Sequence, residues 1–245
     1  MNKINQKKIR ELREIINESN NIVFFGGAGV STASGLKDFR SKDGLYNEKN
    51  NLLNVSPEFM LSVSCFYSFT KEFYKYYKVN MNSLNVKPNI VHEYLVKLEQ
   101  LGKLKAIITQ NIDGLHQKAG SKNVLELHGT IYKNHCIKCG KEYSAEYVFN
   151  SEDIPRCECG SIIKPNVVLY GEMLPEDFVL AEKYISECDL LIVAGTSLIV
   201  EPAASLINYF RGKNLVIINN DETPYDKRAT LIINEDLTSV FKLLS

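Results

Sequence analysis

Four cysteines near the middle of the chain stand in two close pairs, Cys136-x-x-Cys139 and Cys157-x-Cys159, with 17 residues between the pairs. Two thiolate pairs brought together at the ends of a loop supply four soft ligands, which suit a tetrahedral zinc ion. Cysteine occupies all four positions, so no position is left for a reacting water and the zinc is expected to be structural. Four unrelated buried cysteines are the alternative, but they leave the paired spacing without a reason.

The segment around these cysteines carries no excess of positive charge. Five basic side chains between residues 132 and 165 are matched by five acidic ones. A zinc ribbon that grips nucleic acid needs a basic surface, so this module is expected to act as a staple instead. His135 stands next to Cys136 and could substitute as a ligand, although a surface histidine is the simpler interpretation. Cys65 and Cys188 fall in helical patterns and are interpreted as core residues.

A second pattern that could do chemistry is Gly27-Ala28-Gly29, which directly follows the apolar run Ile22–Phe25. Glycines in a strand-to-helix turn let the backbone approach a dinucleotide pyrophosphate, which then meets a helix N-terminus. The fingerprint is incomplete, because Thr32 stands at the third glycine position and no acidic residue follows a second strand to hold a ribose. These gaps disfavour an ordinary nicotinamide dehydrogenase. A tight turn without a ligand stays open as an alternative.

Continuous apolar runs predict the elements that must position these loops. Runs without alternation are typical of strands buried on both faces of a parallel sheet. They lie at residues 22–25, 106–108, 124–125, 190–194, 215–218 and 231–233. Apolar residues at helical spacing lie between or before them, at residues 9–16, 90–101, 178–188 and 203–211. This alternation predicts an α/β fold with a Rossmann-like, doubly wound parallel sheet.

Two segments depart from the alternation of strand and helix. Residues 57–80 are aromatic-rich and helical in rhythm, and residues 132–165 hold the cysteines. We expect one catalytic domain over residues 1–245, in which these two insertions form a smaller lobe. The expected large lobe covers residues 1–44, 86–131 and 166–245; the expected small lobe covers 45–85, the helical insertion, and 132–165, the zinc-ribbon insertion.

The overall composition excludes several classes of protein. The 245 residues include 29 basic and 29 acidic side chains, so bulk electrostatics gives no reason to expect binding to nucleic acid or to a membrane surface. No apolar run approaches the roughly 18 residues of a membrane-spanning helix. The N-terminal residues lack an apolar signal-peptide centre, which favours a cytoplasmic location. In that setting six cysteines are not expected to form a disulfide framework.

The continuation of the glycine loop, Ser31 to Arg40, resembles the first signature of the sirtuins, the NAD-dependent protein-lysine deacylases. Further signatures follow in the family's order: Thr109–His116, Glu126–Gly129, the paired cysteines, Val167–Glu172, Gly195–Leu198 and Ile218–Asn219. The resemblance, to sirtuins of bacterial type, covers the chain from about Asn21 to its end. Three positions depart from the family pattern: Lys37 replaces a proline, Tyr170 replaces a phenylalanine, and the second cysteine pair is short by one residue.

The resemblance implies which residues contact the cofactor NAD. These are Ala28, Gly29, Thr32, Phe39, Arg40, Gln110, Asn111, Ile112, Asp113, His128, Gly195, Thr196, Ser197 and Asn219. By the same resemblance, Ala28 and Thr32 contact the phosphates, and Phe39 and Arg40 close over the cofactor. Asn111 and Asp113 are expected to be catalytic, because they line the pocket that holds the nicotinamide for dissociation. A plain helix cap is the alternative role of this Asn–Asp pair.

His128 is implied to be the general base of the reaction. Its intrinsic pKa lies near neutrality, so the imidazole can accept a proton from a ribose hydroxyl. A histidine that follows a strand is otherwise often structural, and His92 and His116 are lesser candidates for the same role. The substrate is expected to contact Val167, Val168, Leu169 and Tyr170, where an extended acyl-lysine peptide adds as a strand. An ordinary internal strand is the alternative for this segment.

The implied reaction removes acetyl or longer apolar acyl groups from protein lysines and yields nicotinamide, O-acyl-ADP-ribose and free lysine. No arginine occurs from residue 41 to residue 155, and Tyr74-x-x-Tyr77 stands where succinyl-preferring sirtuins place a tyrosine and an arginine. A bidentate partner for a carboxylate is therefore missing, which disfavours succinyl groups. The expected partners are acyl-lysine proteins or peptides, without nucleic acid or membrane, and the enzyme is expected to be a monomer.

Other classes of function remain open on the sequence alone. A protein ADP-ribosyltransferase would use the same NAD site and the same attack on the ribose. A non-catalytic module that binds NAD or acyl-lysine would need neither His128 nor the Gln110–Asp113 stretch, so the presence of both favours an enzyme. An oxidoreductase is a more distant alternative, because the dinucleotide fingerprint is incomplete.

Overall fold

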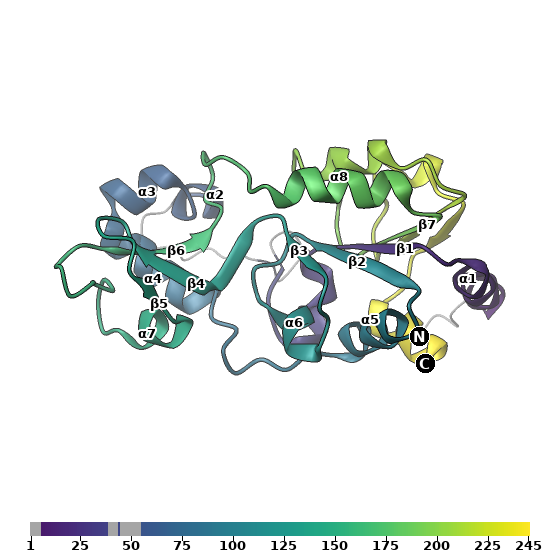
Figure 1. Ribbon diagram of the computed structural model, residues 1–245, viewed down its shortest axis with the longest axis horizontal. Helices are drawn as coiled ribbons and strands as arrows, with labels where there is room; N and C mark the ends of the chain where they lie inside the picture. Colours follow the sequence, from purple (N-terminus) through teal and green to yellow (C-terminus); the bar gives the residue numbers. More distant parts are fainter. Residues whose placement is uncertain (1–5, 39–43, 45–54) are drawn as a thin grey trace.

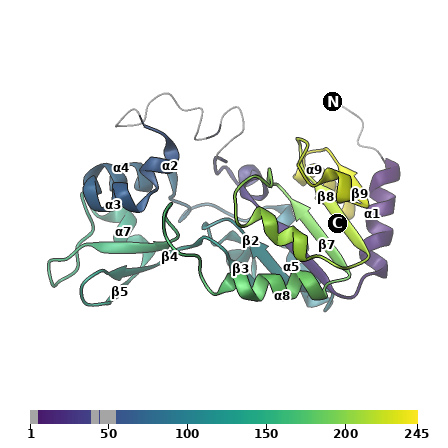
Figure 2. The same cartoon turned by 90° about the horizontal axis from the view of Figure 1, so that it is seen from above.

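The computed structural model describes residues 6–38, 44 and 55–245, which form two sheets at opposite ends of an elongated molecule (Figures 1 and 2). The larger sheet is parallel, with its strands in the order β3-β2-β1-β7-β8-β9. These strands are β1 Ile22–Gly26, β2 Leu104–Thr109, β3 Val124–Glu126, β7 Leu190–Ala194, β8 Asn214–Ile218 and β9 Leu231–Ile233. Each of them coincides with a continuous apolar run, so the predicted Rossmann-like sheet is confirmed.

The apolar runs are continuous because helices cover both faces of the large sheet. Alternate residues of a strand face opposite sides, and β1 accordingly divides between two cores. Ile22 and Phe24 pack in the core of α1 Gln6–Glu18, α5 Ile90–Gln100 and α9 Leu237–Leu244. Val23 and Phe25 pack in the core of α8 Asp177–Glu187 and of a 3₁₀ helix, η4 Ala204–Tyr209. The strands therefore have no polar face that would show as alternation.

The predicted helices are confirmed except for the geometry of one. Residues 203–211 were expected to form an ordinary helix, but η4 is a 3₁₀ helix whose backbone bonds run three residues back, from Ser205 N–H to Pro202 O and from Leu206 N–H to Ala203 O. A segment this short can keep the tighter 3₁₀ winding. Further short elements of the large-sheet region are α6 Leu115–Ala119, η1 Ala28–Val30, η2 Thr32–Ser34 and η5 Asp226–Arg228.

The smaller sheet is antiparallel, with strands in the order β5-β4-β6. It consists of β4 Gly129–Cys136, β5 Glu142–Tyr143 and β6 Ile163–Val167, and it packs with α2 Pro57–Met60, α3 Val63–Ser68, α4 Thr70–Asn80 and α7 Ala145–Asn150. Their core is aromatic: the ring of Tyr77 stacks on Phe73 at 5.5 Å and on Phe149 at 5.4 Å. The two predicted insertions thus share one core, although the lobe boundaries themselves stay a prediction.

The two sheets are joined at Gly129, the first residue of β4 and the third after β3 ends. Gly129 has a φ of +72°, and a Cβ at this position would lie 2.0 Å from the carbonyl oxygen of Asn166 on β6. Only glycine tolerates both the left-handed backbone and the close approach. At this crossing, the chain therefore passes from the large sheet into the small one through a single tightly packed residue.

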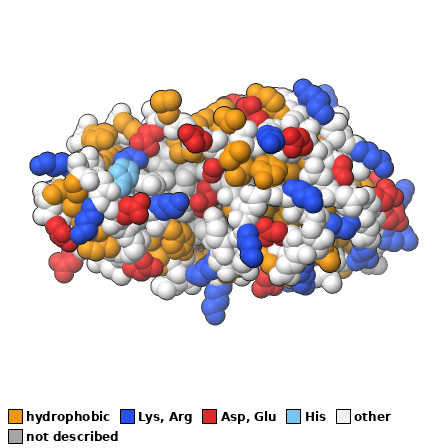
Figure 3. Space-filling model, viewed as in Figure 1, with side chains coloured by type: hydrophobic (Ala, Val, Ile, Leu, Met, Phe, Trp, Pro, Cys, Tyr) orange, Lys and Arg blue, Asp and Glu red, His pale blue; other side chains and the backbone are white. Residues whose placement is uncertain are grey.

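The surface shows no strong separation of charge on the face seen in Figure 3, where basic and acidic side chains are interspersed over both ends of the molecule. Within the described ranges, no helix combines the length and the apolar character that a membrane span requires.

Candidate active site

A cavity of about 590 Å³ lies at the carboxyl ends of the large sheet's strands. Its walls come from the loops that follow β1, β2, β3, β7 and β8, and from the chain that leaves β6. The strand order reverses direction at β1, with β2 on one side and β7 on the other. Such a switch point leaves a crevice where α/β proteins bind nucleotides and related ligands. The volume is that of an ordinary small-molecule site.

The glycine loop after β1 lies directly against the loop after β7. Gly29 N–H donates to Gly195 O at 2.8 Å, and Gly27 N–H donates to Ala194 O at 3.2 Å. A Cβ on Gly27 would lie 2.6 Å from the Cβ of Thr196, and one on Gly29 would lie 2.8 Å from the Cα of Gly195. The glycines are therefore required for backbone packing between the loops, and two of them, Gly29 and Gly195, also line the cavity.

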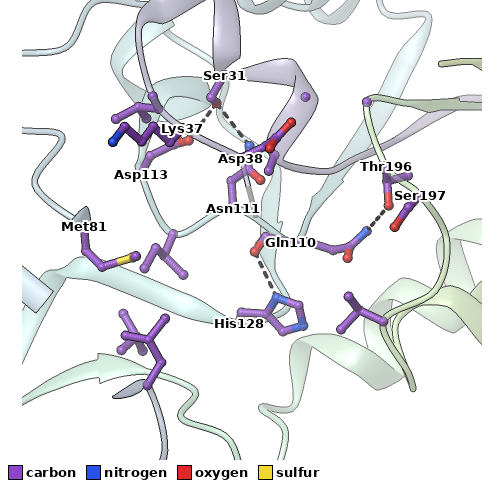
Figure 4. A pocket seen from close by; sticks show the side chains of 18 of the residues that line it. Ser31, Lys37, Asp38, Met81, Gln110, Asn111, Asp113, His128, Thr196 and Ser197 are labelled. Atoms are coloured by element: carbon purple, nitrogen blue, oxygen red, sulfur yellow. Dashed lines mark hydrogen bonds between the residues drawn. The ribbon is translucent and has the colours of Figure 1, made fainter. Parts of the chain in front are cut away.

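Behind this loop, a serine links two polar residues that follow β2. Ser31 Oγ donates to Asp113 Oδ2 at 2.7 Å and accepts from Asn111 Nδ2 at 3.1 Å (Figure 4). Asn111 Nδ2 also donates to Gly27 O at 3.1 Å. The Asn111 side chain is therefore held between the β1 and β2 loops, with its orientation fixed by two acceptors.

Asp113 is buried, and both of its carboxylate oxygens are bonded. Oδ2 accepts from Ser31, and Oδ1 accepts the Leu115 N–H at 2.9 Å, at the start of α6. Burial raises the pKa of this carboxyl, while the Leu115 and Ser31 hydrogen bonds act in the opposite direction. The helix-cap role considered from the sequence is thus present, and the same carboxylate also lines the cavity.

His128 stands two residues beyond β3 with its ring orientation set by the backbone. Its Nδ1 lies 2.9 Å from Gln110 O (Figure 4). A carbonyl can only accept, so Nδ1 carries the proton and Nε2 of the neutral ring keeps a free lone pair. Burial lowers the pKa of His128, and the bond to Gln110 opposes that shift. Gln110 is itself anchored, because its Nε2 donates to Thr196 Oγ1 at 3.0 Å.

The segment after β6 forms the wall of the cavity beside His128. Val168 N–H donates to His128 O at 2.9 Å, and Tyr170 N–H donates to Leu61 O at 3.0 Å. The Leu169 N–H and carbonyl are both bonded to Glu172, the carbonyl accepting at 2.9 Å from the Glu172 N–H. The backbone N–H and carbonyl of Leu169 are therefore already bonded within the chain, so this residue of the expected edge Val167–Leu169 is not free to pair with a peptide.

Residues 27–202 match the model of the Sir2 family, which is well over half of the chain. The chain belongs to the Sir2 family. Two relatives named NAD-dependent protein deacetylase are those of Clostridium acetobutylicum, 53% identical over 96% of this chain and 97% of its own, and Clostridium perfringens, 54% identical over 95% and 96%. These values place the whole described fold, and not only its sheet, within the family.

Solved Sir2 structures match the fold over almost its full length. One, of Sir2 with a p53 peptide and NAD+, is 41% identical with a TM-score of 0.84 and covers 96% of this chain and 95% of that chain. Another, of a mutant Sir2 with a deacetylated p53 peptide and 3'-O-acetyl ADP-ribose, is 40% identical with a TM-score of 0.89 and covers 96% of both chains. The sirtuin resemblance and the predicted fold class are confirmed.

Most of the residues that the sirtuin resemblance assigns to NAD line this one cavity. They are Ala28, Gly29, Thr32, Gln110, Asn111, Ile112, Asp113, His128, Gly195, Thr196, Ser197 and Asn219, and the substrate residues Val167, Val168, Leu169 and Tyr170 line it as well. Phe39 and Arg40 lie outside the described residues. His92 of α5 and His116 of α6 are absent from the described lining and pack against each other between these helices, at 4.7 Å between ring centroids. The individual roles stay predictions.

The four paired cysteines of this Sir2-family chain meet at one end of the small sheet. The sulfur atoms of Cys136, Cys139, Cys157 and Cys159 all lie within 4.8 Å of one another. Four sulfurs bound to one zinc at about 2.3 Å are separated by about 3.8 Å at the corners of a tetrahedron, so the spacing fits the ion. Gly140 and Gly160 follow the pairs with φ values of +73° and +82°, which turns each loop back toward its sulfurs.

Several residues of the site carried no predicted role. Ser31 and Glu172 stand inside family signatures, but their contacts depend on loops that meet only in the fold. Ser83, whose Oγ donates to Asp113 O at 2.9 Å, lies in a polar stretch without any motif. Met81 reaches the cavity as well, and so does Tyr77, which had been considered only for acyl preference. Only the family signature around Ser31 and Glu172 could have drawn attention to them.

Proposed function

We propose that this protein is an NAD-dependent protein-lysine deacetylase with one structural zinc ion. The observation that carries the proposal is one cavity that is lined by His128, with a free Nε2, by the glycine loop and by the segment that follows β6. The names of the clostridial relatives support the same activity. Solved Sir2 structures that contain NAD+, a p53 peptide or acetyl ADP-ribose support the substrates and the product.

The dinucleotide fits the loops of the large sheet. Gly29 and Gly195 line the cavity with backbone on which the pyrophosphate would lie, and Gln110 and Thr196 line it with polar groups. When bound, NAD would supply an ADP-ribose that accepts the acyl group. Asn111 and Asp113, held by Ser31, would orient the nicotinamide carboxamide, because an amide and a carboxylate match its donor and acceptor groups.

The general base that accepts the proton in this reaction is assigned to His128. With Nδ1–H bonded to Gln110 O, the free Nε2 can accept a proton from a hydroxyl that reaches the cavity at this point. The Val168 N–H bond to His128 O ties the same residue to the wall where the acyl-lysine peptide would lie. Base and substrate strand are thus linked through one backbone group.

The acyl group is proposed to be acetyl or a longer apolar chain. Tyr74 and Tyr77 are both buried in the aromatic core, and the hydroxyl of Tyr74 donates to Ile163 O. Lys75 is exposed, and Lys78 Nζ is engaged by Ser151 Oγ at 2.7 Å and by neighbouring carbonyls. Neither of these lysines is part of the described cavity lining. A succinyl carboxylate would therefore meet no bidentate partner there.

The test is nicotinamide release from NAD, measured by chromatography with an acetyl-lysine peptide and with the unmodified peptide as control. The proposal expects release only with the acetylated peptide, in equal amounts with O-acetyl-ADP-ribose. Release that ignores the acetyl group, together with ADP-ribose transferred to protein, would support the transferase alternative instead. A succinylated version of the same peptide should be turned over more slowly than the acetylated one.

The remaining partners are proposed on charge alone. Net charge is zero and both signs are interspersed on the face shown in Figure 3, which favours a peptide over nucleic acid as the macromolecular substrate. A cytoplasmic monomer stays a prediction.

A further inference from the structure

The cavity has two halves, one on each side of the glycine loop that follows β1. In the sheet order β3-β2-β1-β7-β8-β9, the nicotinamide candidates Asn111 and Asp113 follow β2, and His128 follows β3. A dinucleotide binds across such a switch point, with its pyrophosphate at the centre and one nucleoside on each side. With the nicotinamide on the β2 side, the adenosine falls against the loops that follow β7, β8 and β9. This adenosine half of the described lining consists of residues 196, 197, 200–202, 219–221, 236 and 237.

The adenosine half of the cavity is lined by carboxylates. Glu201 follows β7, Asp221 follows β8, and Asp236 follows β9. Among the described lining residues, this half holds neither a lysine nor an arginine, and Lys37, on the β1 side, is the single lysine or arginine of the whole described lining. A bound dinucleotide therefore meets a negative potential around its adenosine ribose.

Asp221 is placed by a turn that backbone and side-chain bonds fix at the end of β8. Asn219 N–H donates to Ile233 O at 3.1 Å, and Asn219 Nδ2 donates to Asp221 O at 2.9 Å. The side chain of Asp221 is exposed. Dinucleotide-binding folds commonly use an acidic residue that follows a strand to accept the ribose 2′-hydroxyl. The sequence lacks that residue after a second strand, and Asp221 offers a carboxylate after β8 instead.

Asp236 occupies the N-terminus of α9, a kind of position that often binds phosphate. Its Oδ2 accepts the Ser239 N–H at 2.8 Å and also the Thr238 hydroxyl. Partial burial alone would raise the pKa of Asp236, but the bonds from Thr238 and Ser239 outweigh it and lower the pKa, so the group is charged at neutral pH. The helix end that could have held a phosphate is therefore filled by the chain's own carboxylate.

NADP differs from NAD by a phosphate on the 2′-oxygen of the adenosine ribose, which adds up to about two negative charges. We propose that Asp221 and Asp236 make this protein select NAD and reject NADP. The 2′-hydroxyl of NAD can donate a hydrogen bond to a carboxylate. The phosphate of NADP, in contrast, is repelled by Asp221 and finds the N-terminus of α9 filled by Asp236. This inference rests on the proposed use of NAD in this cavity.

The test is the ratio of the dissociation constants for NADP and NAD, measured by calorimetry without a peptide. We expect the parent protein to bind NAD at least about a hundredfold more tightly, because like charges brought together in a binding site strongly disfavour the wrong ligand. Asp221→Asn should lower the ratio about threefold, and Asp221→Arg at least about tenfold, because a guanidinium pairs with the 2′-phosphate. Asp236→Asn should also lower it about threefold, since asparagine keeps the helix cap and removes the charge.

Glu222→Gln is the matched control. Glu222 follows Asp221 directly, is exposed, and is absent from the described lining, so the same change of charge should leave the ratio unchanged. Melting temperature shows whether each variant is folded. The inference is overturned if the parent ratio is below about tenfold, if the folded double variant of Asp221→Arg with Asp236→Asn keeps the parent ratio, or if Glu222→Gln shifts it as much as Asp221→Asn does. Binding of NAD by the parent tests the proposed cofactor separately, because the inference is judged on the ratio.

Discussion

At His128, a backbone carbonyl decides which ring nitrogen carries the proton. Gln110 O takes Nδ1–H, and burial disfavours the charged ring. The bond to Gln110 O selects the tautomer with the proton on Nδ1, and burial keeps the ring neutral although that bond favours the charged form, so Nε2 is the acceptor. A histidine held this way can act as a base without the carboxylate partner that many catalytic histidines use, and two expected outcomes follow from this one residue.

Replacing His128 by alanine should lower kcat for deacetylation by about 10²- to 10⁴-fold, the range that a positioned general base contributes. The fold should persist, because the side chain is half-buried and, within the described residues, is hydrogen-bonded only to Gln110 O. Nicotinamide release is the measurement, with melting temperature as the check on folding. His135→Ala, on the outer part of β4, is the matched control and should keep near-parent turnover. A folded His128→Ala protein with undiminished turnover would exclude His128 as the base.

The pH profile of kcat/KM should show an acid limb whose midpoint lies below 6.5. The neutral ring is the active form, and burial lowers the His128 pKa from 6.5. Lowering the pH to 6.5 therefore leaves most of the enzyme competent, and activity falls only as the pH passes the shifted pKa. The profile can be measured from about pH 5 to about pH 9 with a saturating concentration of NAD. An acid midpoint above 7 would contradict this burial effect.

At the scale of secondary-structure elements, helices α5 and α6 bury two histidines, His92 and His116, that have no role in the proposed reaction. His92 and His116 are 0% and 1% exposed, and within the described chain neither nitrogen of His116 has a hydrogen-bond partner. The His92 Nδ1 accepts from Asn89 N–H at 3.2 Å at the start of α5. Burial lowers the pKa of His92 from 6.5 to about 4 and holds that of His116 well below 6.5. The contact is therefore stable only while both rings are neutral.

This contact should make folding stability sensitive to mild acid. Between pH 6.5 and pH 4 the unfolded chain protonates His92 while the folded chain does not, so stability falls as pH falls. From His92 alone, the free energy of unfolding in urea should be about 2 kcal/mol lower at pH 5 than at pH 7. A His92→Gln variant should lose that part of the difference. An identical pH dependence in parent and variant would contradict the prediction.

What could be predicted from the sequence differs between kinds of element. The strands were predictable because a run such as Leu190–Ala194 is apolar at every position, as is typical of a strand that is buried on both faces of a parallel sheet. The four cysteines were predictable because metal ligands impose a spacing on the chain. Contacts between distant loops could not be predicted from the sequence. Ser31, for example, meets Asp113 only because β1 and β2 pair in the fold. The ion pair of Lys164 with Glu172 and the 3₁₀ winding of Ala204–Tyr209 likewise depend on packing that no local pattern reports.

Over the whole molecule, the aromatic core of the small sheet is separate from the two cores of the large sheet. The zinc cysteines line no part of the described cavity, so the ion can affect activity only through the small sheet. β6 belongs to that sheet and leads directly into the wall beside His128. Loss of the ion is therefore expected to disturb the cavity through β6 and the segment that follows it.

Elemental analysis should find about one zinc per chain, and a strong chelator or Cys139→Ser should remove it. Turnover of the acetyl-lysine peptide should then fall at least tenfold, and heat unfolding should split into an early step for the small sheet and a later one for the large sheet. The free cysteine Cys65→Ser is the control, since its thiol lies in α3 away from the cluster. Full turnover by zinc-free protein, with a single unfolding step, would contradict the prediction.

The passage through Gly129 has a mechanical consequence. His128 is the last residue before the joint, its carbonyl holds Val168 from the other sheet, and the joint has no room for even a methyl group. The chain also crosses between the two ends after α4 and after β6, but this crossing has no slack, so a rotation of the small sheet against the large one would strain the bond from Val168 N–H to His128 O. A ligand that contacts both ends of the molecule is therefore expected to shift the position of the His128 ring, because His128 carries the backbone bond between the two sheets.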